Sequence, residues 1–202
     1  MKDNNLKQVL LSVLGVAILI VAVVGISFAA FSYSKTGTKV NTITSGTITM
    51  SYSETTNGIN LSNAFPMSDA VGKTLEDESQ YFDFTITANI VGTTTINYLI
   101  SCTKESGSTL VDSAVKVYLT DMTSSADTQI VAPTKMSTLT KTGSSEVSGA
   151  PSGQYELSSG TISSSTTKKY RLRMWVADDY NVTGSTQTYK LRVNVYGKAV
   201  AQ

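Results

Sequence analysis

Residues 81–102, YFDFTITANIVGTTTINYLISC, determine the fold that this sequence predicts. Large apolar side chains alternate with polar ones on both sides of Gly92, and a period of two residues is typical of half-buried β-strands. We therefore predict strands at 80–89 and 94–103. Their inward side chains are Phe82, Phe84, Ile86, Ala88, Ile96, Tyr98, Ile100 and Cys102.

The alternation extends in both directions along the chain. Further strands are predicted at 46–53, 110–120, 168–177 and 190–197. Their inward side chains are Ile48, Met50, Tyr52, Val111, Val115, Val117, Leu119, Tyr170, Leu172, Met174, Val176, Leu191, Val193 and Val195. A turn-rich stretch at 105–108 predicts a hairpin between the strands at 94–103 and 110–120.

The remaining segments carry weaker signals. Residues 121–165 are rich in Ser, Thr and Gly, and they predict loops with minor strands at 129–132, 155–157 and 161–162. No sustained helical period occurs after Phe31. The expected fold is therefore all-β, an antiparallel β-sandwich or jelly roll.

An apolar segment precedes this domain, since no charged residue lies between Lys7 and Lys35. A positive N-terminus and small residues before Ala30 predict a signal peptide cleaved after Ala29. The segment is also long enough for a hydrophobic helix that stays in the membrane, so cleavage and retention remain alternatives. Both place the rest of the chain outside the cytoplasm, as a secreted or a membrane-anchored cell-surface protein.

These signals divide the chain into three parts. Residues 1–29 are the export segment, 30–45 an extended Ser/Thr-rich segment, and 46–202 one β-sandwich domain.

Composition excludes several classes of function. Sixteen basic residues stand against 15 acidic ones, so no nucleic-acid partner is expected. Cys102 is the single cysteine, which excludes an internal disulfide, and its place in the alternation predicts a core position. The chain has no histidine, which removes Ser-His-Asp chemistry and HExxH zinc sites. We predict neither an enzyme nor a cofactor.

Two candidate sites remain. Asp178 and Asp179 lie in a predicted turn, where they are either solvated charges or part of a weak calcium site. The acidic group 76–78 is interpreted as solvated loop charges. Trp175, Tyr196 and Arg173 are predicted on the outward face of neighbouring strands, as a carbohydrate-stacking platform or as side chains paired across strands or covered by a loop.

The junction between export segment and domain carries a resemblance. Phe28-Ala29-Ala30-Phe31-Ser32, a polar spacer, residues 45–50 (SGTITM) and residues 60–63 (NLSN) resemble the start of the TasA and camelysin family of secreted bacterial proteins. The resemblance covers roughly the first 90 residues. Phe28 stands where the family commonly has Trp.

The resemblance implies a jelly-roll domain, processing by a SipW-type signal peptidase between Ala29 and Ala30, and self-association into extracellular matrix fibres. In that family an N-terminal segment acts as donor strand for the neighbouring subunit. Carried over, the donor is Ala30 to about Thr44. An extended segment of this kind adds to a sheet edge, and its anchoring side chains would be Phe31, Tyr33, Val40 and Ile43.

Three functions therefore follow from the sequence. The first is a structural fibre subunit of a biofilm matrix or cell surface, and the second is a monomeric adhesion module held in the membrane by Val9 to Phe31. The third, a camelysin-like peptidase, is disfavoured because histidine is absent.

Overall fold

The computed structural model describes residues 16, 32–36, 41–45, 48–56, 59, 65–144, 148–182 and 187–200. Its strands are β1 (Ser32–Thr36), β2 (Asn41–Ser45), β3 (Ile48–Glu54), β4 (Tyr81–Ile90), β5 (Thr95–Lys104), β6 (Val115–Asp121), β7 (Thr128–Lys135), β8 (Tyr155–Ile162), β9 (Thr166–Val176) and β10 (Leu191–Val200). Short helices are α2 (Asp69–Gly72), η1 (Asp112–Ala114) and η2 (Met136–Thr138).

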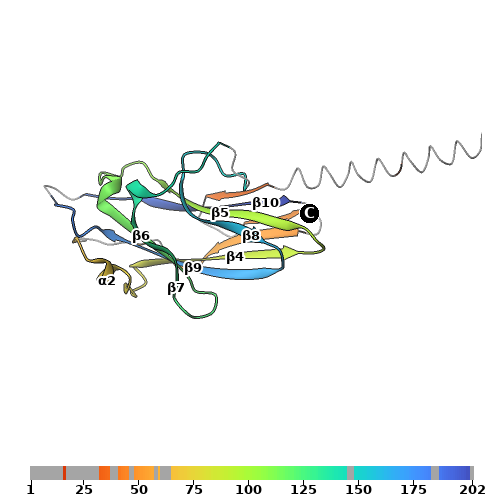
Figure 1. Ribbon diagram of the computed structural model, residues 1–202, viewed down its shortest axis with the longest axis horizontal. Coiled ribbons are helices and arrows are strands. Elements are labelled where there is room, and N and C mark those ends of the chain that lie inside the picture. The colour runs from red at the N-terminus through yellow and green to blue at the C-terminus, as the bar shows by residue number, and fades with distance from the viewer. Residues whose placement is uncertain are drawn as a thin grey trace, which may run out of the picture.

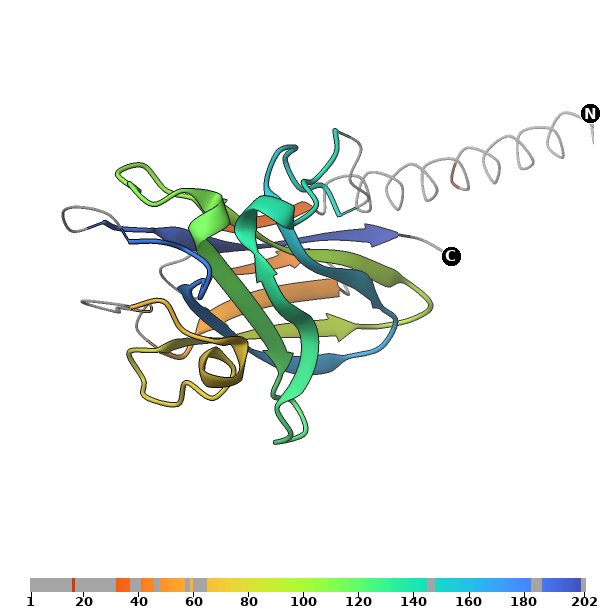
Figure 2. The same cartoon turned by 60° about the vertical axis from the view of Figure 1, so that its left-hand side comes forward.

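The strands form two antiparallel sheets packed face to face (Figure 1). One sheet has four strands in the order β1-β10-β5-β8, and the other has six in the order β2-β3-β4-β9-β6-β7. The predicted all-β antiparallel architecture is thereby confirmed. Figure 2 shows the layers from a second direction, with α2 outside the six-stranded sheet.

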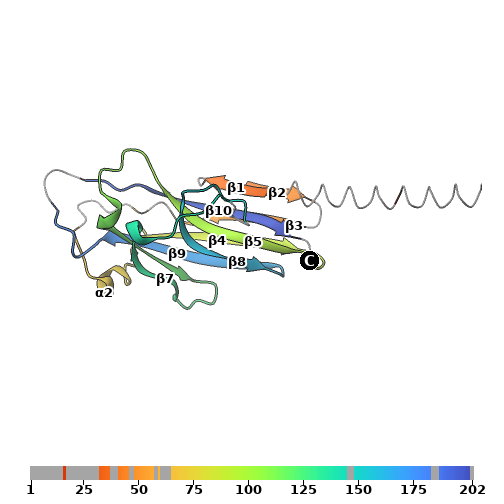
Figure 3. The ribbon, with the colours of Figure 1, turned by 45° about the horizontal axis from the view of Figure 1, so that its top comes forward.

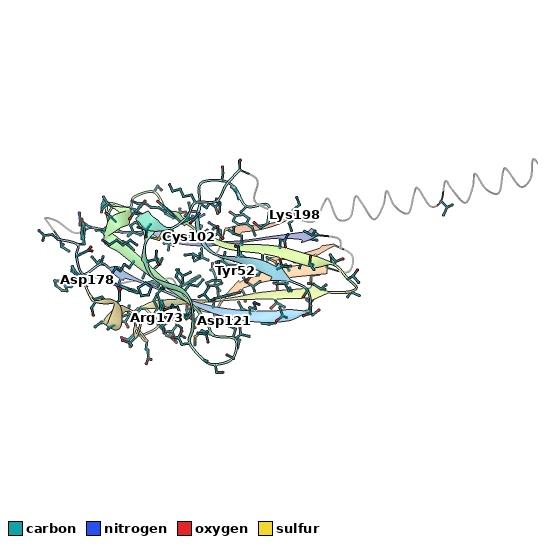
Figure 4. The ribbon with its side chains drawn as sticks, viewed as in Figure 1. Tyr52, Cys102, Asp121, Arg173, Asp178 and Lys198 are labelled. Atoms are coloured by element: carbon teal, nitrogen blue, oxygen red, sulfur yellow. The ribbon has the colours of Figure 1, made fainter. Side chains whose placement is uncertain are left out.

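The core lies between the sheets, as the alternation predicted. Met50 and Tyr52 of β3 and Ile100 and Cys102 of β5 are all fully buried in one cluster, and Figure 4 places Tyr52 and Cys102 inside the sandwich. Most other predicted inward side chains are buried beside them. Val111 is the exception at 51% exposed, because the strand begins four residues later at Val115 and η1 precedes it.

The predicted hairpin through 105–108 is wrong. β5 pairs with β10 and β8 in one sheet, whereas β6 pairs with β7 and β9 in the other. Residues 105–114 therefore cross from one layer to the other. A tight turn does form at Gly107, which has φ +81°, but two strands that alternate in the same way can belong to different sheets.

The minor strands predicted at 129–132, 155–157 and 161–162 are longer than expected: the first lies within β7, and the other two belong to one strand, β8. Both lie at sheet edges, and β7 leaves most of its side chains exposed or half-buried. A strand with so few buried side chains needs little apolar sequence, which is why its composition resembled a loop.

Two segments cover the outer faces of the sheets. Residues 65–80, called the strap below, run over β9 and β6 and include α2, and Met67 donates its backbone N–H to Val176 O at 3.1 Å. Residues 140–144 and 148–154, called the cover below, lie against the four-stranded sheet, where Ala150 packs with Leu99 and Tyr196.

Among the described residues, no helix has the length and apolar character needed to cross a membrane. The predicted export segment, apart from Val16, lies outside those residues.

Candidate functional site

The segment predicted to act as a donor provides one edge strand to each sheet. β1 is the terminal strand of the four-stranded sheet and pairs antiparallel with β10, from Ser32 opposite Lys198 to Thr36 opposite Asn194. β2 is the terminal strand of the six-stranded sheet and pairs with β3. Figure 3 shows both strands at the same side of the sandwich. We call this pair the N-terminal edge.

The individual donor residues are only partly placed. Tyr33 lies in β1 opposite Gly197, and Ile43 lies in β2 opposite Met50. Phe31 and Val40 lie outside the described residues. The same holds for the predicted cleavage position, Ala29 and Ala30.

The two sheets approach closely behind the N-terminal edge. A Cβ added to Gly197 of β10 would lie 2.5 Å from Met50 Sδ of β3 and 3.3 Å from Ile96 Cγ2 of β5. No side chain fits there without displacing a neighbour, since even a methyl group would overlap Met50. Glycine therefore brings β10 and β3 together at the point where β1 adds to the sheet.

The outward face of β10 is fixed by a polar network under the cover. Gln154 Nε2 donates to Tyr196 Oη at 2.8 Å, and Ser101 Oγ donates to Gln154 Oε1 at 2.5 Å. Asn194 Nδ2 donates to Thr103 Oγ1 at 2.7 Å, which ties β10 to β5. β10 is thus held by β5 and the cover in addition to its pairing with β1.

The predicted carbohydrate platform is wrong, and the alternative of burial beneath loops holds. Trp175 and Arg173 lie on β9, in the six-stranded sheet, whereas Tyr196 lies on β10 in the other sheet. All three are at most 4% exposed. The strap covers Trp175 so tightly that a Cβ on Gly72 would lie 2.3 Å from Trp175 Cε2.

Arg173 instead anchors the strap to the sheet. Its Nε donates to Leu75 O at 2.8 Å, and its Nη2 lies 2.8 Å from Asp127 Oδ2. Burial of Asp127 raises the pKa of its carboxyl, but hydrogen bonds from Arg173 and Thr120 outweigh this and leave the pKa below its usual value. A buried guanidinium needs such partners, so the outward position of Arg173 has a structural role.

Sequence reasoning missed a polar cluster around Asp112 at the start of η1. Its carboxylate accepts hydrogen bonds from Tyr155 Oη, from Tyr189 Oη at 3.0 Å and from Lys104 Nζ at 2.9 Å. Burial raises the pKa of Asp112, but these three donors together lower it below the ordinary value. The same carboxylate raises the pKa of Tyr155 to about 12. The cluster joins four chain segments, and no local sequence pattern indicates it.

Asp178 and Asp179 do not converge on a common point. Asp178 lies 3.3 Å from Lys116 Nζ, while Asp179 lies 2.6 Å from Lys135 Nζ. Within the described ranges, no group of three or more acidic or thiol side chains is arranged to hold a metal, the acidic stretch 76–78 included. The two carboxylates therefore serve ion pairs to β6 and β7, and the calcium interpretation gains no support.

Cys102 occupies the predicted core position, and burial raises the pKa of its thiol far above the usual range. It is therefore an apolar packing group and an unreactive thiol.

No family model, curated protein or solved structure matches this chain.

Proposed function

We propose that the chain is a secreted structural subunit that assembles into extracellular fibres by exchange of its N-terminal edge. The observation that carries the proposal is the position of β1, which closes the four-stranded sheet through pairing with β10. The antiparallel layers, with chain segments that cross between them, support a jelly-roll assignment of the finer fold.

The exchange needs no new kind of contact. β1 is paired with β10 from Ser32 to Thr36 within one chain, and the same backbone pairs form when β1 of one copy lies on β10 of the next. Because each copy gives a strand at one place and receives a strand at another, the contact is heterologous and does not close into a ring. Repetition of such a contact produces a filament.

Export precedes assembly in this proposal. A SipW-type peptidase cleaves between Ala29 and Ala30, as the resemblance to the TasA and camelysin family implies, and this releases β1 from its membrane tether. A tethered chain keeps β1 beside its own membrane, which limits its reach to a neighbouring copy.

A second candidate, the membrane-tethered adhesion module, is favoured by a different observation. Phe65 is 76% exposed, Val71 52% and Val182 47%, and all three lie near the end of β9. The start of β1 and the end of β10 lie at the opposite end of the sandwich (Figure 1). A molecule tethered through its N-terminus would present these apolar side chains away from the membrane.

Two single-cysteine variants test the exchange directly. Ser32 and Lys198 are partners in the register, and Cys102 is buried, so Ser32→Cys chains mixed with Lys198→Cys chains crosslink to each other only when β1 crosses to another copy. We expect the mixed disulfide in fibres of residues 30–202, seen by negative-stain microscopy and non-reducing electrophoresis. The control mixes Ser32→Cys with Gln129→Cys on β7.

The outcomes separate the two candidates. Exchange is supported if the fibres contain the mixed disulfide and if a chain that starts at Gly46 forms no fibres. Single particles without the disulfide at every concentration leave the adhesion module as the better proposal.

A further inference from the structure

β8 is a sheet edge that, among the described residues, is paired on its outer side only at the beginning. Glu156 donates its backbone N–H to Thr140 O at 2.9 Å, and Tyr155 forms a bridge with Lys141. Beyond Glu156, none of the described strands pairs with the outer side of β8. The backbone groups of residues 158–161 that point away from β5 are therefore open to another strand.

The edge at residues 158–161 lacks the usual protection against pairing. Its sequence, Ser-Ser-Gly-Thr, has no charge and no proline, and Ser159, Gly160 and Thr161 are exposed. Natural sheets normally protect such edges with charges, proline or bulges.

β7, the edge strand next to β6, has that protection. It contains Pro133, ends at Lys135, and its pairing with β6 shifts register twice, between Val117 and Leu119 and between Leu119 and Thr120. β8 has one register shift, where Ile100 and Ser101 of β5 face it, and its pairing is regular from Ser158 to Ile162. Residues 158–161 are therefore the less protected of the two edges.

We propose that β8 pairs antiparallel with β8 of a second copy, so that the two four-stranded sheets become continuous across a two-fold axis. An axis at Ser159 sets Ser158 opposite Gly160 of the second copy, and the pairing ends before Glu156, whose backbone N–H is already bonded to Thr140 O. No two like charges meet in this register, which removes the main penalty of self-pairing.

Local packing suits a close approach of the second strand. Gly160 has no side chain, and a Cβ there would lie 3.1 Å from the Tyr98 ring. The hydroxyl of Ser159 donates to Glu156 Oε1 at 2.7 Å, which holds that carboxylate over its own strand. The edge is therefore neutral along residues 158–161.

The contact is independent of the exchange of β1, because β1 and β8 lie at opposite edges of the same sheet. It joins copies side by side. A fibre built by exchange would gain lateral contacts from it, and a tethered adhesion module would become a dimer.

A self-crosslink at the axis tests the contact in the full-length chain, purified in mild detergent. Ser159→Cys faces the same residue of the partner, and directly opposed strand residues lie within the Cα separation that a disulfide spans, about 4.4–6.8 Å. We expect Ser159→Cys to form covalent dimers under mild oxidation. Gln129→Cys, on the exposed part of β7, is the matched control for random collision in the micelle.

A second variant measures the association without a crosslink. Ser159→Lys sets two lysines opposite each other at the axis, and we expect it to shift the chain from dimer to monomer in sedimentation velocity. Equal crosslinking of Ser159→Cys and Gln129→Cys, or a monomeric unaltered chain, overturns the proposal. So does preferential crosslinking of Ser159→Cys to Ser32→Cys, because β1 of the second copy would then occupy the edge.

Discussion

Gly72→Ala offers a sharp test of how the strap holds the six-stranded sheet. Gly72 ends α2, and a Cβ there would lie 2.3 Å from Cε2 and 2.4 Å from Cδ2 of Trp175. Trp175 is 2% exposed and is the single tryptophan of the chain. The variant therefore adds one methyl group directly against the natural fluorescent reporter of the protein.

Two effects oppose each other in this variant. Alanine is favoured over glycine inside a helix by about 1 kcal/mol, which would stabilise α2. The methyl group, however, must move more than about 1 Å from a rigid ring to reach an ordinary contact of about 3.5 Å, and overpacking of this kind costs about 1–3 kcal/mol. Because α2 is a single turn, we expect the steric cost to win, with a net loss of about 1–2 kcal/mol.

We expect the strap to be displaced and β9 to stay in place, since β9 is paired with a strand on both sides. Its displacement would expose the indole, whose Nε1 has no hydrogen-bond partner among the described residues, to water. We expect a red shift of Trp175 emission and a Tm lower by roughly 2–8 °C. Ala70→Ser is the control, because Ala70 lies in the same helical turn and is exposed, so a small addition there should leave Trp175 emission unchanged. An unshifted emission together with a raised Tm would refute the reasoning.

The remaining predictions concern the hydrogen-bond networks of Asp127 and Asp112. Asp127→Asn removes the charge that faces the buried Arg173, and we expect a loss of about 2 kcal/mol in chemical denaturation; Asp127→Glu should recover part of it. Because the folded pKa of Asp127 lies below its ordinary value, its contribution is present above about pH 4 and is lost as the pH falls, so the Asn variant should flatten the acid limb of the stability curve. The Asp112 carboxylate raises the pKa of Tyr155 to about 12, so this contribution is complete below about pH 10 and is lost as the pH rises towards 12. Tyr155→Phe should therefore weaken the alkaline fall in stability, and an unchanged profile would contradict the network.

The alternation predicted where most strands lie and which way their side chains face. It succeeded for β4 and β5 because both bury one complete face, and a two-residue period reports the buried face directly. The alternation did not predict which strands pair with each other, as the wrong hairpin after β5 shows. A face that is buried against the other sheet looks the same in sequence whichever strand lies beside it.

The covering of the outer sheet faces could not be predicted from the sequence, for a related reason. Trp175 and Arg173 alternate with the core residues of β9 and so were predicted to face outward, which they do. Their burial depends on a strap about 100 residues earlier in the chain, and Arg173 meets Leu75 across that separation. The Asp112 cluster likewise joins η1, β5, β8 and Tyr189, so no single segment contains its pattern.

The pairing of β1 with β10 has a consequence for the order in which the molecule is completed. Ser32 lies opposite Lys198, so the first described strand can pair only after the last one has formed. A chain that emerges N-terminus first must therefore hold β1 without its partner until nearly every other residue has appeared, and contacts so distant in sequence form slowly. A chain cut short before β10 never closes this edge. Closure of the four-stranded sheet therefore requires delivery of the chain as far as β10.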